Sequence, residues 1–169
     1  MNRGNELLAH LDAGYNLARW LLKNDQDARD VLQDSFIRAF RFKGEVENLK
    51  PWFLTVVRNT AYSSMKKKMP VMDVEELSFS ENEADSGPSP EEAALQKAEL
   101  DIVSFALSAV SEQYREIFVL REIEQLSYQE LAEVLNLPMG TVMSRLARAK
   151  VKILELVRKE EQNPSRRES

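Results

Sequence analysis

Residues Leu126 to Ile153 read LSYQELAEVLNLPMGTVMSRLARAKVKI, and this segment predicts two helices joined by a short turn. Ser127 and Glu130 form an S-x-x-E capping box, which begins a helix by satisfying its unpaired N–H groups. Residues 137–140, LPMG, are expected to break that helix. A second helix follows, because apolar residues recur at i, i+4, i+7 and i+11: Val142, Leu146, Ala149 and Ile153.

The pair has the layout of a DNA-binding helix-turn-helix, whose second helix enters the major groove. At about 100° per residue, small side chains fall on the outer face of the second helix, where they let the backbone approach base edges. Arg148 has the fork geometry that reads guanine, and the flanking cations suit phosphates. The alternative interpretation is an ordinary helical hairpin that does not bind DNA and whose basic face is solvated. The candidate DNA-binding residues are Thr141, Met143, Ser144, Arg145, Ala147, Arg148, Val151 and Lys152.

Composition sets limits on the rest of the chain. The 169 residues are 43% hydrophobic, enough for one ordinary domain or two small ones. The formal charge of −5 argues against a uniformly basic coat for nucleic acid, so the distribution of charge matters more than its sum. The absence of cysteine excludes disulfides and thiolate metal sites. No apolar run approaches a membrane span and no signal-peptide pattern is present, so we expect a cytoplasmic protein without membrane insertion.

The chain divides into two helical halves. Residues 70–90, PVMDVEELSFSENEADSGPSP, contain no Lys or Arg and predict an acidic linker without packed structure. No strand pattern occurs, and the expected fold is all-α, with two small helical domains joined by this flexible linker. The expected boundaries are a first domain at 1–69, the linker at 70–90, a helix-turn-helix domain at 91–160 and a disordered tail at 161–169.

Helical periodicity gives the elements of each half. Leu7 to Leu22 mark an opening helix or helix pair, and Gly14 is the residue that argues against one continuous helix. Asp25 or Asp27 is a candidate cap for the next helix. Pro51 suits the first turn of a third helix, which ends in a lysine run. In the second half, Ser89-Pro90 and Ser111 are predicted helix starts. The buried stripe expected for the second helix is Val31, Leu32, Phe36, Ala39 and Phe40.

Nothing in the sequence supports an enzyme. His10 is the only histidine, and without cysteine or a second histidine a structural zinc site is excluded on ligand grounds. The chain has no glycine-rich phosphate loop and no nucleophile elbow. We therefore predict no catalytic, metal or cofactor-binding residues and no cofactor.

The aromatic residues allow two interpretations. Phe36, Phe40, Trp52 and Phe53 fall on apolar stripes and are expected in the core. Tyr62, like Phe42, lies near a stripe edge beside basic segments, and aromatic rings next to cations suit single-stranded DNA. Composition alone favours core packing for these two as well.

Three segments together resemble the bacterial sigma-70 family, in its short extracytoplasmic function (ECF) branch. They are DARDVLQDSFIRAFRF (27–42), NLKPWFLTVVRNTAYSSMKKK (48–68) and SEQYREIFVLREIEQLSYQELAEVLNLPMGTVMSRLARAKVKI (111–153). Each motif is moderately specific, whereas their order and spacing together are highly specific. The match covers most of the chain except the linker and both tails.

The resemblance implies a role for each segment. Asp30, Gln33 and Asp34, with Arg38 on the same face, match the surface that grips the polymerase β′ subunit. The loop 43–50 matches the one that captures a flipped base of the minus-ten element, and the helix-turn-helix matches the reader of the minus-thirty-five element. The acidic linker fits a connector that runs through the polymerase. The candidate minus-ten residues are Lys43, Asn48, Lys50, Arg58, Asn59, Tyr62, Lys66 and Lys67.

The resemblance thus implies a sigma factor that binds the β′ and β subunits of core RNA polymerase and promoter DNA, under the control of an anti-sigma factor. Two other classes stay open: a stand-alone helix-turn-helix regulator, and an interaction-only mimic of a sigma factor. Met143 and Ala147 replace bulky or basic residues of some relatives, so the minus-thirty-five sequence is not carried over.

Overall fold

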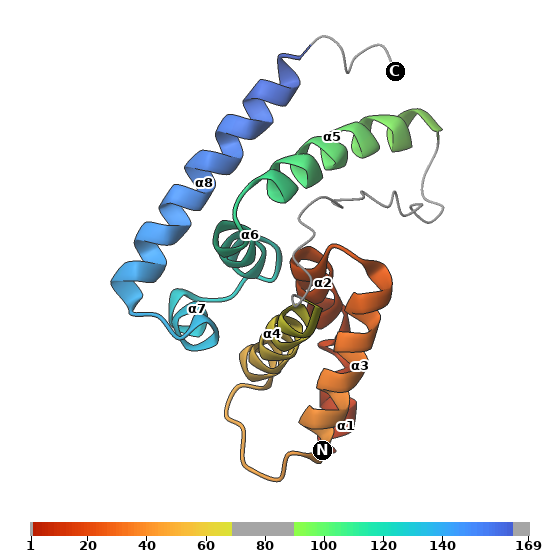
Figure 1. Ribbon diagram of the computed structural model, residues 1–169, viewed down its shortest axis with the longest axis vertical. Helices are drawn as coiled ribbons and strands as arrows, with labels where there is room; N and C mark the ends of the chain where they lie inside the picture. The colour runs from red at the N-terminus through yellow and green to blue at the C-terminus, as the bar shows by residue number, and fades with distance from the viewer. Residues whose placement is uncertain (1, 69–89, 164–169) are drawn as a thin grey trace.

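The computed structural model describes residues 2–68 and 90–163, and every element among them is helical (Figure 1). The N-terminal half contains α1 (Arg3–Leu8), α2 (Leu11–Leu22), α3 (Asp25–Arg41) and α4 (Leu49–Lys68). The C-terminal half contains α5 (Pro90–Ala109), α6 (Glu112–Phe118), a π-helical turn η1 (Val119–Ile123), α7 (Tyr128–Leu135) and α8 (Met139–Glu161). The all-α prediction is confirmed. The predicted linker, apart from Pro90, and the tail from residue 164 lie outside the described residues.

The opening segment is a helix pair, and its break falls at Ala9 and His10 rather than at Gly14. Gly14 lies buried in the middle of α2. A Cβ atom at this position would stand 2.9 Å from the Phe53 ring and 3.0 Å from the Leu32 side chain. The glycine is therefore required by the close packing of α2 against α3 and α4, not by a turn.

The start and the buried face of α3 both differ from the sequence prediction. Asn24 caps this helix, since its side chain accepts a hydrogen bond from the Asp27 N–H at 3.0 Å, so Asp25 and Asp27 are not the cap. Phe40 is 54% exposed, and the prediction that it belongs to the core is wrong. Small side chains take the buried positions because neighbouring helices approach α3 closely: Ala28, Val31, Ser35 and Ala39.

The C-terminal half begins its helices largely as predicted. The Ser111 hydroxyl accepts a hydrogen bond from the Tyr114 N–H at 3.4 Å at the start of α6. The helix then widens into η1, where the Glu124 N–H donates to the carbonyl of Val119 five residues earlier. Gln125 follows in the left-handed region with φ of 61°. This change of direction sets α7 at an angle to α6, and periodicity alone did not predict it.

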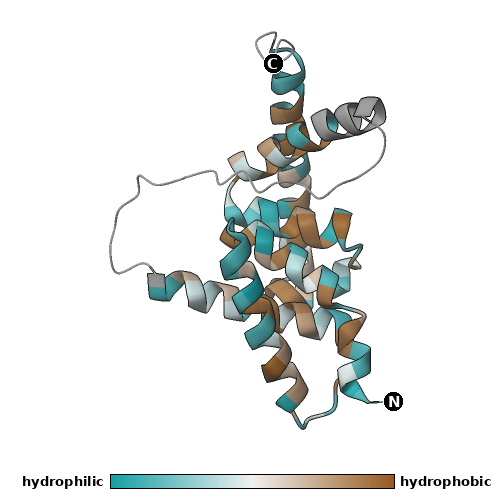
Figure 2. Ribbon diagram, turned by 90° about the vertical axis from the view of Figure 1, so that its right-hand side faces the viewer, coloured by the Kyte–Doolittle hydropathy of each residue, from teal (hydrophilic) through white to brown (hydrophobic). Residues whose placement is uncertain are grey.

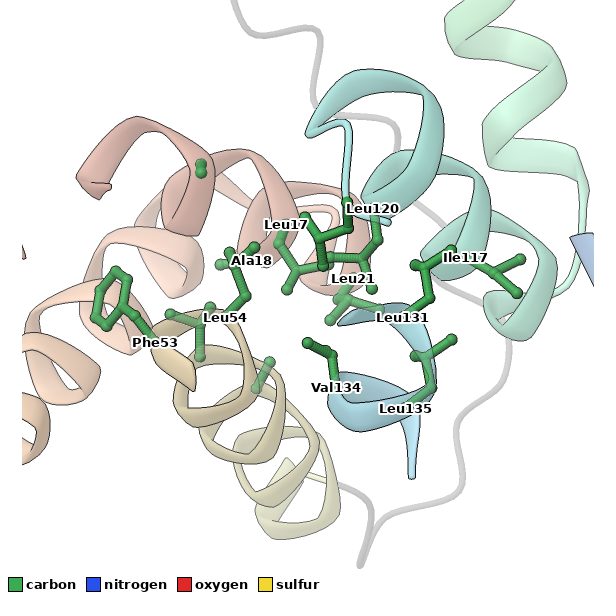
Figure 3. Packing of buried hydrophobic residues seen from close by; sticks show 14 of the residues in the cluster. Leu17, Ala18, Leu21, Phe53, Leu54, Ile117, Leu120, Leu131, Val134 and Leu135 are labelled. Atoms are coloured by element: carbon green, nitrogen blue, oxygen red, sulfur yellow. The ribbon is translucent and has the colours of Figure 1, made fainter. Parts of the chain in front are cut away.

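One hydrophobic core joins the two halves. Leu17 and Leu21 of α2 and Leu54 of α4 lie against residues of α6, η1 and α7 (Figure 3). Figure 2 shows that the C-terminal end of α4 projects away from the other helices. A second, smaller cluster holds α5 against α8. The buried residues that the C-terminal half contributes to the shared core include Ile117, Leu120, Leu131, Val134 and Leu135.

Candidate nucleic-acid and polymerase interfaces

The helix-turn-helix is built by local hydrogen bonds that the sequence predicted. The Ser127 N–H donates to the Glu130 carboxylate at 2.9 Å, and the Glu130 N–H donates to the Ser127 hydroxyl at 3.1 Å, which completes the capping box. The first helix of the pair, α7, ends at Asn136, whose φ of 53° is left-handed. Pro138 precedes α8 as its N-cap residue. The break therefore lies at 136–138, and Met139 and Gly140 already belong to the second helix.

The second helix, α8, presents the predicted outer face to solvent. The stripe Val142, Leu146, Ala149 and Ile153 is buried, as expected. Thr141 and Arg145 are half-buried, and the Ser144 hydroxyl donates to the Thr141 carbonyl at 3.2 Å. Part of the outer face is a shallow, open hollow, which Ala147, Arg148, Val151 and Lys152 line with Tyr114 and Glu155. The exposed candidate DNA-binding residues are Met143, Ser144, Ala147, Arg148, Val151 and Lys152.

The candidate polymerase-binding residues lie together on the exposed face of α3. Asp30, Gln33, Asp34 and Arg38 are all exposed, and Asp34 pairs with Arg38 at 3.2 Å. Ile37 and Phe40 are exposed beside them, so this surface combines carboxylates with apolar groups. Sequence analysis assigned Phe40 to the core and missed this apolar part. Aromatic residues such as Phe40 are enriched at protein interfaces, which fits docking of a protein on this face.

The candidate minus-ten residues fall into two groups. Six of the eight lie on α4, where Lys50 and Lys67 are about 25 Å apart along the helix axis at 1.5 Å per residue, so these six form a strip along α4. Lys43 and Asn48 precede the helix. Three of the eight, Lys50, Arg58 and Tyr62, are only partly exposed because the C-terminal half covers them. The remaining five are exposed: Lys43, Asn48, Asn59, Lys66 and Lys67.

The three covered residues contact two buried carboxylates of the C-terminal half. The Arg58 Nε lies 2.9 Å from Glu116, and the Tyr62 hydroxyl donates to the same carboxylate at 2.6 Å. The Lys50 ammonium lies 3.7 Å from the Glu124 carboxylate and donates to the Glu124 carbonyl at 2.8 Å. Burial, followed by the charge and the hydrogen bond of Glu116, raises the pKa of Tyr62 well above its usual range. Tyr62 therefore remains a protonated donor at neutral pH.

Sequence analysis did not assign a role to Glu116 or Glu124. A signal for Glu116 was present, because Glu116 and Leu120 are spaced i, i+4 and so share one helical face. A charge on an apolar face predicts a partner from another element. Glu124 lies just after η1, and the wider π-helical geometry of η1 directs the Glu124 side chain toward α2 and α4. No pattern in the sequence indicates this π-helical segment.

Arg115 is a third buried charged residue that the sequence analysis did not single out. It is 2% exposed, and its guanidinium donates to the carbonyls of Leu107 at 2.7 Å, Ser108 at 3.1 Å and Val110 at 2.9 Å. A longer contact of 3.4 Å reaches the Trp20 carbonyl of α2. Burial lowers the pKa of Arg115. The side chain thus ties the end of α5 to α6 and to the N-terminal half.

Within 2–68 and 90–163, no group of three or more His, Asp or Glu side chains could hold a metal ion. In the same part of the chain, no helix is both long enough and apolar enough to cross a membrane.

Comparison with known proteins identifies both halves. The family model for sigma-70 region 2 matches residues 7–70, and the model for sigma-70 region 4 matches residues 100–153. The chain is 28% identical over 149 residues to the ECF RNA polymerase sigma factor SigW of Bacillus subtilis, covering 82% of this chain and 80% of SigW. It is 32% identical over 136 residues to the ECF RNA polymerase sigma-E factor of Escherichia coli K12, covering 73% of this chain and 70% of that protein.

A solved structure is similar over nearly the whole length. The sigma factor RpoE of Bartonella quintana, crystallised in complex with the anti-sigma factor NepR, matches with a TM-score of 0.73 and 29% identity. The match covers 91% of this chain and 95% of that one. The resemblance inferred from three sequence segments is confirmed: the chain belongs to the ECF branch of the sigma-70 family.

Proposed function

We propose that this chain directs core RNA polymerase to a dedicated set of promoters. The observation that carries the proposal is the order of the two matched regions on one chain: region 2 at 7–70 and region 4, with an exposed helix-turn-helix, at 100–153. A stand-alone regulator needs only the second region. The function is binding and positioning rather than catalysis by this chain, and the proposed location is the cytoplasm, where polymerase and DNA meet.

Each surface receives one role in this proposal. Residues 1–69 bind the polymerase through Asp30, Gln33, Asp34 and Arg38 and contact the minus-ten element through the strip along α4. Residues 91–160 contact the minus-thirty-five element through the outer face of α8. The segment 70–90 connects the two halves and carries negative charge along the polymerase. Both the β′ and β subunits are expected partners.

An anti-sigma protein is the proposed regulator. The support is the similarity to a sigma factor that was solved together with an anti-sigma factor. Such a protein is expected to cover the polymerase-binding faces. Co-purification from the native host, under resting and stressed conditions, tests this point, and recovery of polymerase alone under both conditions would contradict it.

The central experiment is run-off transcription with purified core polymerase and a genomic promoter library. We expect specific transcripts only when both polymerase and this chain are present. Tight sequence-specific binding to duplex DNA without polymerase would favour the stand-alone regulator. Binding to a regulator protein, with no transcripts and no DNA binding, would favour the interaction-only mimic.

A further inference from the structure

The contact between the two halves uses the side chains that the region 2-like half offers to DNA. Glu116 is 2% exposed and faces Arg58 and Tyr62, and Glu124 is 8% exposed and faces Lys50. The Asn16 amide of α2 also donates to the Glu124 carboxylate, at 3.3 Å. The polar contacts between the halves thus include two carboxylates from one half, which face three candidate minus-ten residues and Asn16 of the other. Arg115 and Lys23 add contacts to backbone carbonyls across the halves.

A carboxylate and a phosphodiester compete for the same kinds of donor. Both present anionic oxygens to guanidinium, ammonium and hydroxyl groups, and most contacts between protein and nucleic-acid backbone are of this type. The Arg58 side chain is only 24% exposed while it pairs with Glu116. A DNA phosphate therefore cannot reach these donors unless the carboxylates leave them.

The composition of the contact points to a reversible closure rather than to maximal stability. Burying two carboxylates carries a large desolvation cost, and apolar residues of similar volume often hold such a contact equally well or better. The Arg58 Nε lies close to Glu116 but makes no hydrogen bond, so its contact is an ion pair of imperfect geometry. The two carboxylates instead make the contact between the halves depend on donor groups that DNA phosphates can also bind.

We propose that Glu116 and Glu124 are internal competitors of DNA phosphates, which hold the free chain closed and its Arg58–Tyr62–Lys50 site occupied. The proposal rests on the assignment of that site to promoter DNA. Opening of the contact between α2–α4 and α6–α7 releases the carboxylates and exposes the three donors together. In the closed, isolated chain the carboxylates fill this site, and the chain therefore binds DNA weakly. Its net charge of −5 is not the only cause.

The first test compares Glu116→Gln with Glu122→Gln in the full chain. Glutamine keeps the shape of the side chain and removes its charge. Glu122 is the matched control, because it pairs with Lys150 of its own half at 2.8 Å and its replacement changes the net charge equally. The probe is a fluorescein-labelled, mixed-sequence single-stranded oligonucleotide, and binding is read by anisotropy at one low salt concentration.

We expect Glu116→Gln to bind the probe about tenfold more tightly than Glu122→Gln, since affinity scales with the fraction of molecules in the competent state. Equal gains in the two variants would show a general charge effect and overturn the proposal. Unchanged binding with lower thermal stability would show that Glu116 is only a structural residue, and would also overturn it.

The second test measures opening directly and does not depend on a buried substitution. Asn16→Asp places a carboxylate opposite Glu124 at an exposed position, so the fold should tolerate it. The chain has no cysteine, and Gln26→Cys with Arg158→Cys provides two exposed labelling sites, one in each half, for energy transfer. We expect the label separation to increase with Asn16→Asp but not with Gln129→Glu, an exposed change of equal charge. Equal separations would contradict closure.

Transcription with core polymerase separates this inference from the proposed function. A wild-type chain that supports no transcription, while Glu116→Gln still gains DNA affinity, would reject the sigma function and keep the internal competition. Promoter-specific transcription, together with equal DNA affinities of Glu116→Gln and Glu122→Gln, would support the sigma function and reject the internal competition.

Discussion

Replacing Arg115 by methionine should strongly destabilise the chain. The guanidinium is buried at the C-terminal end of α5, where it donates to the carbonyls of Leu107, Ser108 and Val110 at 2.7–3.1 Å. These carbonyls lie at or just beyond the end of a helix, where a cation interacts favourably with the helix dipole. Methionine keeps much of the volume but removes every donor.

The size of the effect follows from opposing contributions. Hydrogen bonds that involve a charged group contribute about 1.5–3 kcal/mol each to stability. The three short bonds are offset by the cost of removing the guanidinium from water, which is several kcal/mol per ion. Methionine also leaves buried carbonyls without a donor, and each costs about 1–3 kcal/mol. We expect a net loss of about 3–5 kcal/mol, a large part of the roughly 5–15 kcal/mol typical of a folded domain.

Urea denaturation followed by far-UV circular dichroism at neutral pH measures this loss. Arg121→Met is the matched control, because Arg121 donates to one carbonyl, that of Leu126 at 2.7 Å, and stacks over Tyr128 at 4.4 Å. The control should lose about 1–2 kcal/mol. Arg115→Lys should lie between the wild type and Arg115→Met. If Arg115→Met costs no more than Arg121→Met, the guanidinium makes no net contribution and the reasoning from its hydrogen bonds is refuted.

Three further predictions concern the candidate surfaces and the packing of α2. Asp34→Arg should weaken binding to core polymerase in a pull-down. The melting temperature should stay nearly unchanged, because the exposed ion pair of Asp34 with Arg38 contributes less than about 1 kcal/mol to stability. Polymerase binding equal to that of the wild type would remove Asp34 from the interface. Arg148→Ala should lower run-off transcription about tenfold to a hundredfold at promoters that depend on the minus-thirty-five element, the 1–3 kcal/mol of a bidentate base contact; an equal drop across all minus-thirty-five variants would show a phosphate contact instead. Gly14→Ala should cost about 1–3 kcal/mol in denaturation, since its Cβ overlaps the Phe53 ring, and no loss would mean that α2 can shift.

The helix-turn-helix was predictable because its signals are local. The Ser127–Glu130 capping box lies three residues apart, and the stripe from Val142 to Ile153 requires only helical periodicity. Its turn was placed too late because Asn136 ends α7 in a left-handed conformation, which asparagine adopts more readily than most residues. The outer face of α8 follows from the buried face by geometry.

The contact between the halves was not predictable in the same way. Leu54 and Leu131 lie on apolar faces, and periodicity says that such faces are buried but not against which element. The partners of Glu116 lie more than fifty residues away in sequence, and local patterns carry no information on such distances. Phe40 shows the opposite error: it lies on the apolar stripe of α3, yet small neighbours fill the close contact and leave its ring outside.

The packing of α6 and α7 on α2 and α4 also limits how far apart the two candidate DNA-binding surfaces can lie, whichever residues form the contact. α4 has 20 residues and α8 has 23, so at 1.5 Å per residue they are about 30 Å and 35 Å long, or about 65 Å even if laid end to end. The names of the minus-ten and minus-thirty-five elements place them about 25 base pairs apart, which is about 85 Å of duplex at 3.4 Å per base pair. The strip along α4 and the outer face of α8 cannot reach both elements while α6 and α7 remain packed on α2 and α4. In the proposed function, use of both surfaces on one promoter therefore requires separation of the halves, and the free energy of binding polymerase and promoter together must exceed the free energy of the contact between the halves.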